Sequence, residues 1–174
     1  MKRPILIHPD PRLKKVCEPV PDITDGVRAL AQDMLDTMYD APGIGLAAPQ
    51  VGVNARMLVM DCSKRDESTD PPQPMCLINP EITAASDTLS EYEEGCLSIP
   101  EIFANVTRPE AVTVRYLDAD GNEHERDFEG LWAVCVQHEV DHLNGKLFID
   151  YLSQMRRQLI TSKMKKLKRE RARG

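Results

Sequence analysis

The sequence predicts one domain that combines three helices with several short strands. A chain of 174 residues is long enough for one sizeable core, and 41% hydrophobic with 29% charged residues is ordinary for a globular protein. Three apolar stripes have helical spacing, and the short apolar runs between them have the length of strands. A turn signal between two later runs predicts a β-hairpin, so at least part of the sheet is antiparallel.

The N-terminal 22 residues carry Pro4, Pro9, Pro11, Pro19 and Pro21. Because proline donates no backbone hydrogen bond, we expect this segment to wrap the surface without regular structure. A helix follows, capped by residue 22 or 24 (Asp or Thr) and ending at about residue 39. Its core-facing stripe consists of Val27, Leu30, Ala31, Met34, Leu35 and Met38.

The segment from Ala41 to Gln50 is apolar and small but lacks a helical pattern. Gly43 and Gly45 allow a second backbone or a ligand to come close. Gln50 places a polar amide on this apolar segment and needs a partner, for which a reacting carbonyl is one candidate. A purely structural turn is the alternative.

Five later runs are predicted strands. The second ends at Pro80, and the polar, proline-bearing residues 63–74 before it are expected to form a loop. The last two flank the turn signal at 118–122 and form the hairpin. The predicted strands are residues 57–60, 75–79, 82–91, 112–117 and 124–128.

The second helix, expected between Gly130 and Gly145, contains the pattern H-E-x-x-H at His138, Glu139 and His142. Residues four apart lie about one helical turn apart on the same face, so both imidazoles can bind one metal ion. Glu139 can reach a water molecule at the metal and take its proton. The alternative is a buried helix whose two histidines are satisfied by core partners.

The same helical face continues toward the N-terminus through Leu131, Val134 and Cys135. This spacing predicts an apolar pocket directly beside the metal. A metal-activated water next to an apolar pocket favours hydrolysis of a substrate with an apolar side chain.

A catalytic site of this kind needs a third protein ligand and one position for water. A metzincin-like continuation would place that ligand where this chain has Phe148, and Asp150 and Glu170 are the only acids downstream of the helix. Glu170 belongs to a basic tail, so we expect the third ligand upstream.

Cys96 is the favoured upstream ligand, because a thiolate binds metals strongly and the flanking Gly95 lets the backbone approach. His8 and His124 are the alternatives.

The last helix is predicted from about residue 152 to 170, with Leu152, Met155, Leu159, Ile160, Met164 and Leu167 on one side. The whole chain has a net charge of −6, yet Glu170 is the only acid after Gln154. A basic arm on an acidic body suggests an anionic partner, and a solvated helix end is the alternative. The basic residues are Arg156, Arg157, Lys163, Lys165, Lys166, Lys168, Arg169, Arg171 and Arg173.

The N-terminus lacks the apolar stretch of a signal peptide, and no apolar run approaches membrane-spanning length. The five cysteines are scattered, odd in number and free of any CxxC pattern, which favours reduced thiols. We therefore expect a cytoplasmic protein with no membrane partner.

Three motifs together resemble those of the peptide deformylases, in the same order along the chain. They are Gly43-Ile44-Gly45-Leu46-Ala47-Ala48-Pro49-Gln50, Glu94-Gly95-Cys96-Leu97-Ser98 and Gln137-His138-Glu139-Val140-Asp141-His142. The resemblance extends over most of the chain, and the basic C-terminal helix is similar to that of the bacterial type.

The resemblance implies an α+β fold with antiparallel strands packed around the central metal-binding helix, flanked by N-terminal and C-terminal helices. It implies a single domain over 1–174 that removes the formyl group from nascent peptides beginning with N-formylmethionine. It also implies Fe²⁺ as the natural metal, with Zn²⁺, Ni²⁺ or Co²⁺ able to replace it. We further expect a monomer whose C-terminal helix contacts the ribosome.

For individual residues, the resemblance implies metal ligation by Cys96, His138 and His142 and acid/base catalysis by Glu139. Gln50 and the Leu97 N–H resemble the oxyanion donors of the family. One departure concerns Ile102 and Phe103, which stand where some relatives carry an Arg. The substrate-binding positions implied are Ile44, Gly45, Glu94, Gly95, Leu131, Val134 and Cys135.

Three rival functions differ in what they require of the chain. A general metallopeptidase would not distinguish formylated from acetylated peptides, and a structural metal site would have four closed ligands and no need for Glu139. A degenerate deformylase would bind nascent chains without catalysis, against which the intact Glu139 and Gln50 argue.

Overall fold

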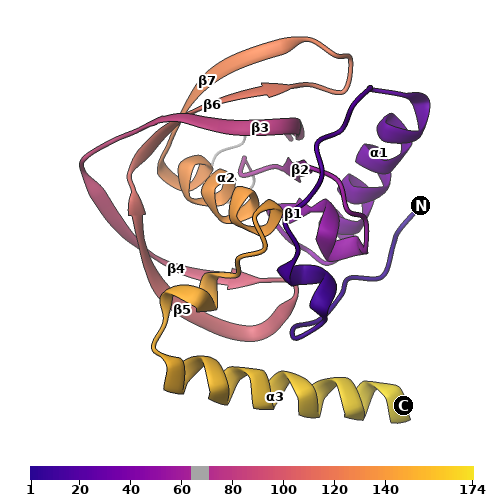
Figure 1. Cartoon of the computed structure of the whole chain (residues 1–174), viewed down its shortest axis with the longest axis vertical. Helices are drawn as coiled ribbons and strands as arrows, with labels where there is room; N and C mark the ends of the chain where they lie inside the picture. Colours follow the sequence, from indigo (N-terminus) through magenta and orange to yellow (C-terminus); the bar gives the residue numbers. More distant parts are fainter. Residues whose placement is uncertain (64–70) are drawn as a thin grey trace.

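The computed structural model describes residues 1–63 and 71–174. Within these ranges one α-helix precedes a run of antiparallel strands, and two α-helices follow it. Helix α2 lies between two sheets, one ordered β1-β2-β3-β6-β7 and the other a β4-β5 pair (Figure 1). The α+β fold with antiparallel strands around a central helix is thus confirmed. The elements are α1 (Asp25–Asp40), β1 (Gly45–Ala47), β2 (Met57–Met60), β3 (Met75–Ala85), β4 (Leu89–Cys96), β5 (Ile99–Pro109), β6 (Ala111–Leu117), β7 (Glu123–Glu129), α2 (Gly130–Leu143) and α3 (Gln154–Arg173).

The N-terminal segment crosses the molecule with one short 3₁₀ turn, η1 (Pro11–Lys14), and otherwise no helix or strand. The Leu6 N–H donates to the Gln50 carbonyl at 2.7 Å, and the His8 N–H donates to the Ser98 carbonyl at 2.9 Å. This N-terminal segment, here called the N-terminal strap, therefore connects two loops that are distant in sequence. Its Leu13 is fully buried, so the segment also closes part of the core.

Helix α1 begins after Thr24, whose hydroxyl accepts a hydrogen bond from the Val27 N–H at 3.3 Å. Thr24 rather than Asp22 is therefore the cap. The buried side chains Leu30, Met34 and Met38 pack the helix against β1 and β2.

The predicted strand 82–91 is wrong as one strand. Residues 82–85 finish β3, which runs through Pro80, and residues 89–91 begin β4. Pro80 is tolerated because the register of β3 against β6 shifts between Ile78 and Glu81, at a point where Asn79 has φ 51. Strand β5 was not predicted at all. Of the predicted loop 63–74, residues 71–74 form no helix or strand, and 64–70 lie outside the described residues.

Helix α2 is buried on nearly every side from Ala133 to Leu143. It packs against the large sheet through Ala133, Val136 and Val140. Gly145 ends it with φ 75, and a Cβ there would lie 2.5 Å from the Lys14 carbonyl oxygen, so a glycine is needed at this point.

Helix α3 begins after Ser153, which caps it by accepting from the Arg156 N–H. Ile160 and Met164 are buried against β5, but Met155 and Leu159 are 73% and 62% exposed. The predicted apolar side was too wide, because Met155 and Leu159 lie about 100–140° around the helix from Ile160. Among the described helices, none has the length and apolar character to cross a membrane.

Candidate active site

Three potential metal ligands from two elements converge at the centre of the molecule. Cys96 ends β4, while His138 and His142 lie one turn apart on α2. Their ligand atoms all lie within 4.8 Å of one another, and the Cys96 Sγ is 3.4 Å from the His142 Nε2. One thiolate and two imidazoles are donors that a divalent transition metal accepts, so the residues fit a metal ion.

The two alternative histidines have other partners. The His8 Nε2 lies 2.8 Å from the Thr161 Oγ1 on α3, and the His124 Nε2 lies 2.7 Å from the Asp118 Oδ2 in the β6–β7 hairpin. Neither belongs to the Cys96 cluster.

A carboxylate orients the first imidazole. The His138 Nδ1 lies 2.9 Å from the Glu94 Oε1, which leaves Nε2 for the cluster. Burial disfavours the charged imidazole, yet the Glu139 carboxylate and the contacts with Cys96 and Glu94 hold the pKa of His138 well above its usual value. Burial instead holds the pKa of His142 well below its usual value. A carboxylate partner, as Glu94 is for His138, is a common feature of metal-binding histidines, since it fixes the ring and its tautomer.

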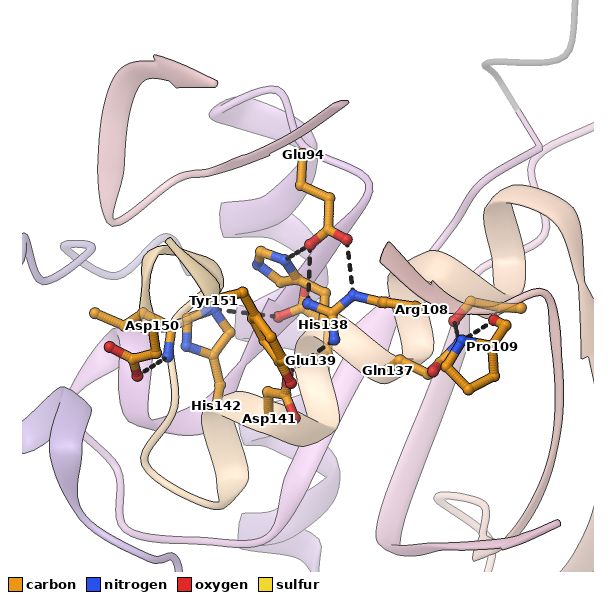
Figure 2. Close-up of polar contacts among 12 residues, drawn as sticks. Glu94, Arg108, Pro109, Gln137, His138, Glu139, Asp141, His142, Asp150 and Tyr151 are labelled. Carbon is orange, nitrogen blue, oxygen red and sulfur yellow. Dashed lines mark hydrogen bonds and ion pairs between the residues drawn. The ribbon is translucent and has the colours of Figure 1, made fainter. Parts of the chain in front are cut away.

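Glu94 is itself held by a buried ion-pair network (Figure 2). The Arg108 guanidinium donates to both Glu94 oxygens, at 2.7 and 2.9 Å, and to the Asp141 Oδ2 at 2.8 Å. The Tyr151 hydroxyl also donates to Asp141, at 2.7 Å. Burial favours the neutral acid, but the hydrogen bonds from His138 and Arg108 keep the pKa of Glu94 below its usual value. Glu94, expected to contact substrate, is therefore engaged with His138 and Arg108.

Glu139 faces the cluster from the same helix. Its Oε1 lies 4.0 Å from the His142 Nε2 and, among the described residues, has no hydrogen-bond partner although it is buried. Burial raises the pKa of Glu139 to about 7, the range suited to a group that takes and returns a proton near neutral pH. Gly45 makes room for it, because a Cβ at Gly45 would lie 2.6 Å from the Glu139 Oε2.

Gln50 is fixed so that its amide nitrogen faces the cluster. The Ala47 N–H donates to the Gln50 Oε1 at 2.9 Å, and the Gln50 Nε2 donates to the Ser98 Oγ at 3.1 Å. The same nitrogen lies 3.5 Å from the Cys96 Sγ. Leu97 follows Cys96 in the turn between β4 and β5 and lines the cleft beside the cluster.

A cleft of about 610 Å³ opens onto this cluster. Gln50, Cys96, His138 and Glu139 lie at its polar end. The apolar pocket expected beside the metal is part of the same cleft, and a cleft of this size accommodates a short peptide segment. Its walls include Ile44, Gly45, Glu94, Gly95, Leu97, Leu131, Val134 and Cys135.

The sequence analysis missed the residues that support the site. Arg108 is only 4% exposed and lies on the unpredicted strand β5. Ala104, Val106 and Arg108 alternate as buried positions of that strand, and this period of two is the signal that could have identified it. Tyr151 gave no comparable signal, and Ser98 was quoted within a motif but given no role, since both act on partners distant in sequence.

Comparisons with known proteins agree with this geometry. The family model described as polypeptide deformylase matches residues 2–158. A peptide deformylase of Bradyrhizobium diazoefficiens is 53% identical over 165 residues, covering 94% of this chain and 95% of that protein.

Two solved structures are similar over nearly the full length. The crystal structure of a peptide deformylase from Legionella pneumophila has a TM-score of 0.90 at 45% identity, covering 100% of this chain and 99% of that one. The peptide deformylase of Ehrlichia chaffeensis in complex with actinonin has a TM-score of 0.90 at 42% identity, covering 96% and 98%. With sequence, fold and site in agreement, the chain belongs to the peptide deformylase family, metallohydrolases that remove the N-terminal formyl group from newly synthesised proteins.

Proposed function

We propose that deformylation takes place at the polar end of the cleft, on a metal ion held by Cys96, His138 and His142. The observation that carries this proposal is the convergence of three ligand atoms within 4.8 Å of one another, next to the buried and unpartnered carboxylate of Glu139. A formate-release assay on a formyl-Met peptide, with the metal content measured on the same sample, tests it.

Each polar residue has a defined role in the reaction. A divalent metal ion bound here supplies Lewis acidity, which lowers the pKa of water and polarises a carbonyl. Glu139 accepts the proton of the attacking water and later delivers it to the departing amine, so formate and a free N-terminus are released. The Gln50 Nε2–H and the Leu97 N–H stabilise the negative charge that develops on the formyl oxygen.

Gln50 is preorganised for this task. Its carbonyl oxygen is already engaged by the Ala47 N–H and one amide hydrogen by Ser98. The other N–H donates to the Cys96 Sγ at 3.5 Å, so the amide is already held at the polar end of the cleft, and donors fixed before the reaction stabilise an oxyanion most effectively.

The methionine side chain occupies the apolar part of the cleft. Ile44, Leu131, Val134 and Cys135 form its walls, and a flexible thioether suits such an irregular apolar space. Gly45 and Gly95 make room for side chains of the cleft, because a Cβ would lie 2.6 Å from the Glu139 Oε2 at Gly45 and 2.6 Å from the Phe103 ring at Gly95.

We propose Fe²⁺ as the metal in the cell, with Zn²⁺, Ni²⁺ and Co²⁺ as substitutes that the same donors accept. Protein purified without oxygen should then contain about one equivalent of iron. The iron protein should lose activity in air faster than a nickel-loaded sample, because both iron and the Cys96 thiolate can be oxidised. Predominant zinc in the anaerobic sample would contradict the assignment of iron.

A general metallopeptidase would differ in substrate choice. We expect rapid hydrolysis of a formylated peptide and almost none of its acetylated counterpart. Equal hydrolysis of the two, or cleavage of an internal peptide bond, would contradict deformylation at this site.

We further propose that the protein acts as a monomer of one domain over 1–174, in the cytoplasm, and contacts the ribosome through α3. The five free thiols suit a reducing compartment. On α3, the side chains of Arg156, Lys163 and Lys166 are exposed, and ribosomal RNA presents phosphates that attract such cations.

A further inference from the structure

A second cavity, of about 580 Å³, lies apart from the cleft that contains the catalytic residues. It is an open cavity lined by residues of α3, of the 3₁₀ turn η3 (Phe148–Tyr151) and of the N-terminal strap. No residue of the metal cluster or of the methionine pocket lines it. The lining residues that matter here are His8, Lys14, Asp150, Arg157, Thr161 and Lys165.

Positive charge exceeds negative charge in this second cavity. Lys14, Arg157 and Lys165 line it, and Asp150 is the one acid among its lining residues. The Asp150 carboxylate already accepts from the Leu147 N–H at 3.0 Å and from the Lys14 Nζ at 3.3 Å. The Asp150 charge is therefore committed to partners within the chain, and two cations remain in surplus.

The histidine in the wall is uncharged. Burial is the main cause that lowers the pKa of His8 to about 4; Lys14, Lys165 and Lys168 add to it, and Asp150 acts against it. The imidazole is consequently neutral at pH 7, and it supplies a hydrogen-bonding group rather than a charge.

Two buried nitrogens beside the cavity lack a partner. The His8 Nε2 lies 2.8 Å from the Thr161 Oγ1, but the His8 Nδ1 and the Arg157 Nε have no hydrogen-bond partner among the described residues. His8 is only 4% exposed. Buried polar atoms are normally paired, so these two indicate a partner that the described chain does not provide.

We propose that this second cavity binds a phosphate group. Arg157 offers a planar set of N–H donors, and Lys14 and Lys165 add mobile ammonium groups around it. A phosphate group accepts hydrogen bonds from several directions, which suits the two surplus cations and the Lys14–Asp150 pair around this cavity. Two sources share this chemistry, namely free inorganic phosphate and the phosphodiester backbone of RNA. The inference rests on this cavity and does not require the ribosome contact proposed above.

The test uses the full-length, metal-loaded enzyme and a charge-matched pair of variants. Arg157→Gln with Lys165→Gln removes two cations from the cavity, while Lys163→Gln with Lys166→Gln removes two exposed cations from the same helix outside it. Calorimetric titration with inorganic phosphate, and separately with acetate, at constant ionic strength should show binding of phosphate in preference to acetate. We expect the cavity variant to lose about tenfold or more in phosphate affinity, equivalent to about 1.4 kcal/mol, and the control variant to stay within about twofold. Formate release from a short formyl-Met peptide should be the same in all three proteins.

A second titration with a short RNA duplex separates the two sources. If the cavity variant binds RNA more weakly than the control variant does, and phosphate competes with RNA, the cavity takes a backbone phosphate. If both variants lose RNA affinity equally while phosphate binding is lost only in the cavity variant, the cavity takes free phosphate. The proposal is overturned if phosphate does not bind, if acetate binds as well, or if the two variants lose phosphate affinity equally.

Discussion

Helix α2 is buried along most of its length, whereas α3 buries only Ile160 and Met164. Polar side chains of α2 such as His138 have defined partners, with the Glu94 Oε1 2.9 Å from the His138 Nδ1, while Glu139 faces the proposed metal ligands. The cations of α3 are exposed except for the half-buried Arg157. Burying a polar group costs free energy unless the group is paired. The chemistry of α2 therefore depends on the positions of its hydrogen-bond partners. An exposed charge attracts a partner over a distance, and salt weakens this attraction. Binding by α3 therefore depends on its net charge.

The largest effect is expected at Glu139. Glu139→Gln keeps the shape of the side chain but removes the group that takes and returns the proton, so kcat/KM should fall about 10²–10⁴-fold. The metal content should be unchanged, because Glu139 is not proposed as a ligand. Formate release and metal analysis on one sample check both statements, and near-normal activity of this variant would contradict the proton-transfer role.

A change in the apolar part of the cleft should act on substrate choice. Val134→Trp fills space beside the metal, so kcat/KM for a formyl-Met peptide should fall roughly 10–200-fold, with the metal retained. A peptide with a small first residue should lose less, because it needs less of the pocket. Equal losses for large and small first residues would show that Val134 does not line the methionine pocket.

A substitution at Arg108 should weaken the support of His138, because Arg108 holds Glu94, the carboxylate that contacts His138. Arg108→Gln removes the cation that pairs with the buried Glu94, and we expect metal affinity to fall about 10–100-fold. The free energy of unfolding should also drop by about 3–5 kcal/mol, because a buried charge loses its partner. Competition with a chelator measures the first quantity and denaturant unfolding the second. Tyr151→Phe is the matched control, since it removes one hydrogen bond from the half-exposed Tyr151 and should change both quantities little.

The contacts that support the proposed metal ligands could not be predicted from the sequence. The H-E-x-x-H pattern places His138, Glu139 and His142 on one helix face through local geometry alone, so that part of the site could be predicted. The pairing of Arg108 with Glu94 depends on how β5 folds back on β4, which no local period reveals. Pro80 looked like the end of a strand because a bulge that accommodates proline leaves little trace in composition. Met155 and Leu159 looked like core because a count of apolar residues does not tell which angle of a helix meets the sheet.

The smallest catalytic effect is expected on α3. Arg156→Gln with Lys163→Gln and Lys166→Gln should leave formate release from short peptides within about twofold. Ribosome binding in a sedimentation assay should weaken, and the slope of log affinity against log salt should fall by roughly 0.7–0.9 for each lost phosphate contact. Substitution is preferable to truncation after Gln154, because truncation would also remove the buried Ile160 and Met164.

The matched control for α3 removes three exposed cations from other parts of the surface, with Lys15→Gln, Arg126→Gln and Lys146→Gln. It should bind ribosomes almost as well as the unchanged protein. If both triple variants weaken equally, overall charge rather than α3 determines the contact.

The central claim is that Cys96 completes the metal site, and the metal content of Cys96→Ser under anaerobic conditions tests it most directly. Cys76→Ser serves as the control, because Cys76 lies in β3 and is not part of the cluster. The account predicts that Cys96→Ser loses most of its metal and its formate release, while Cys76→Ser retains about one equivalent and full activity. A Cys96→Ser protein that keeps one equivalent of metal and the full rate of formate release would contradict the account.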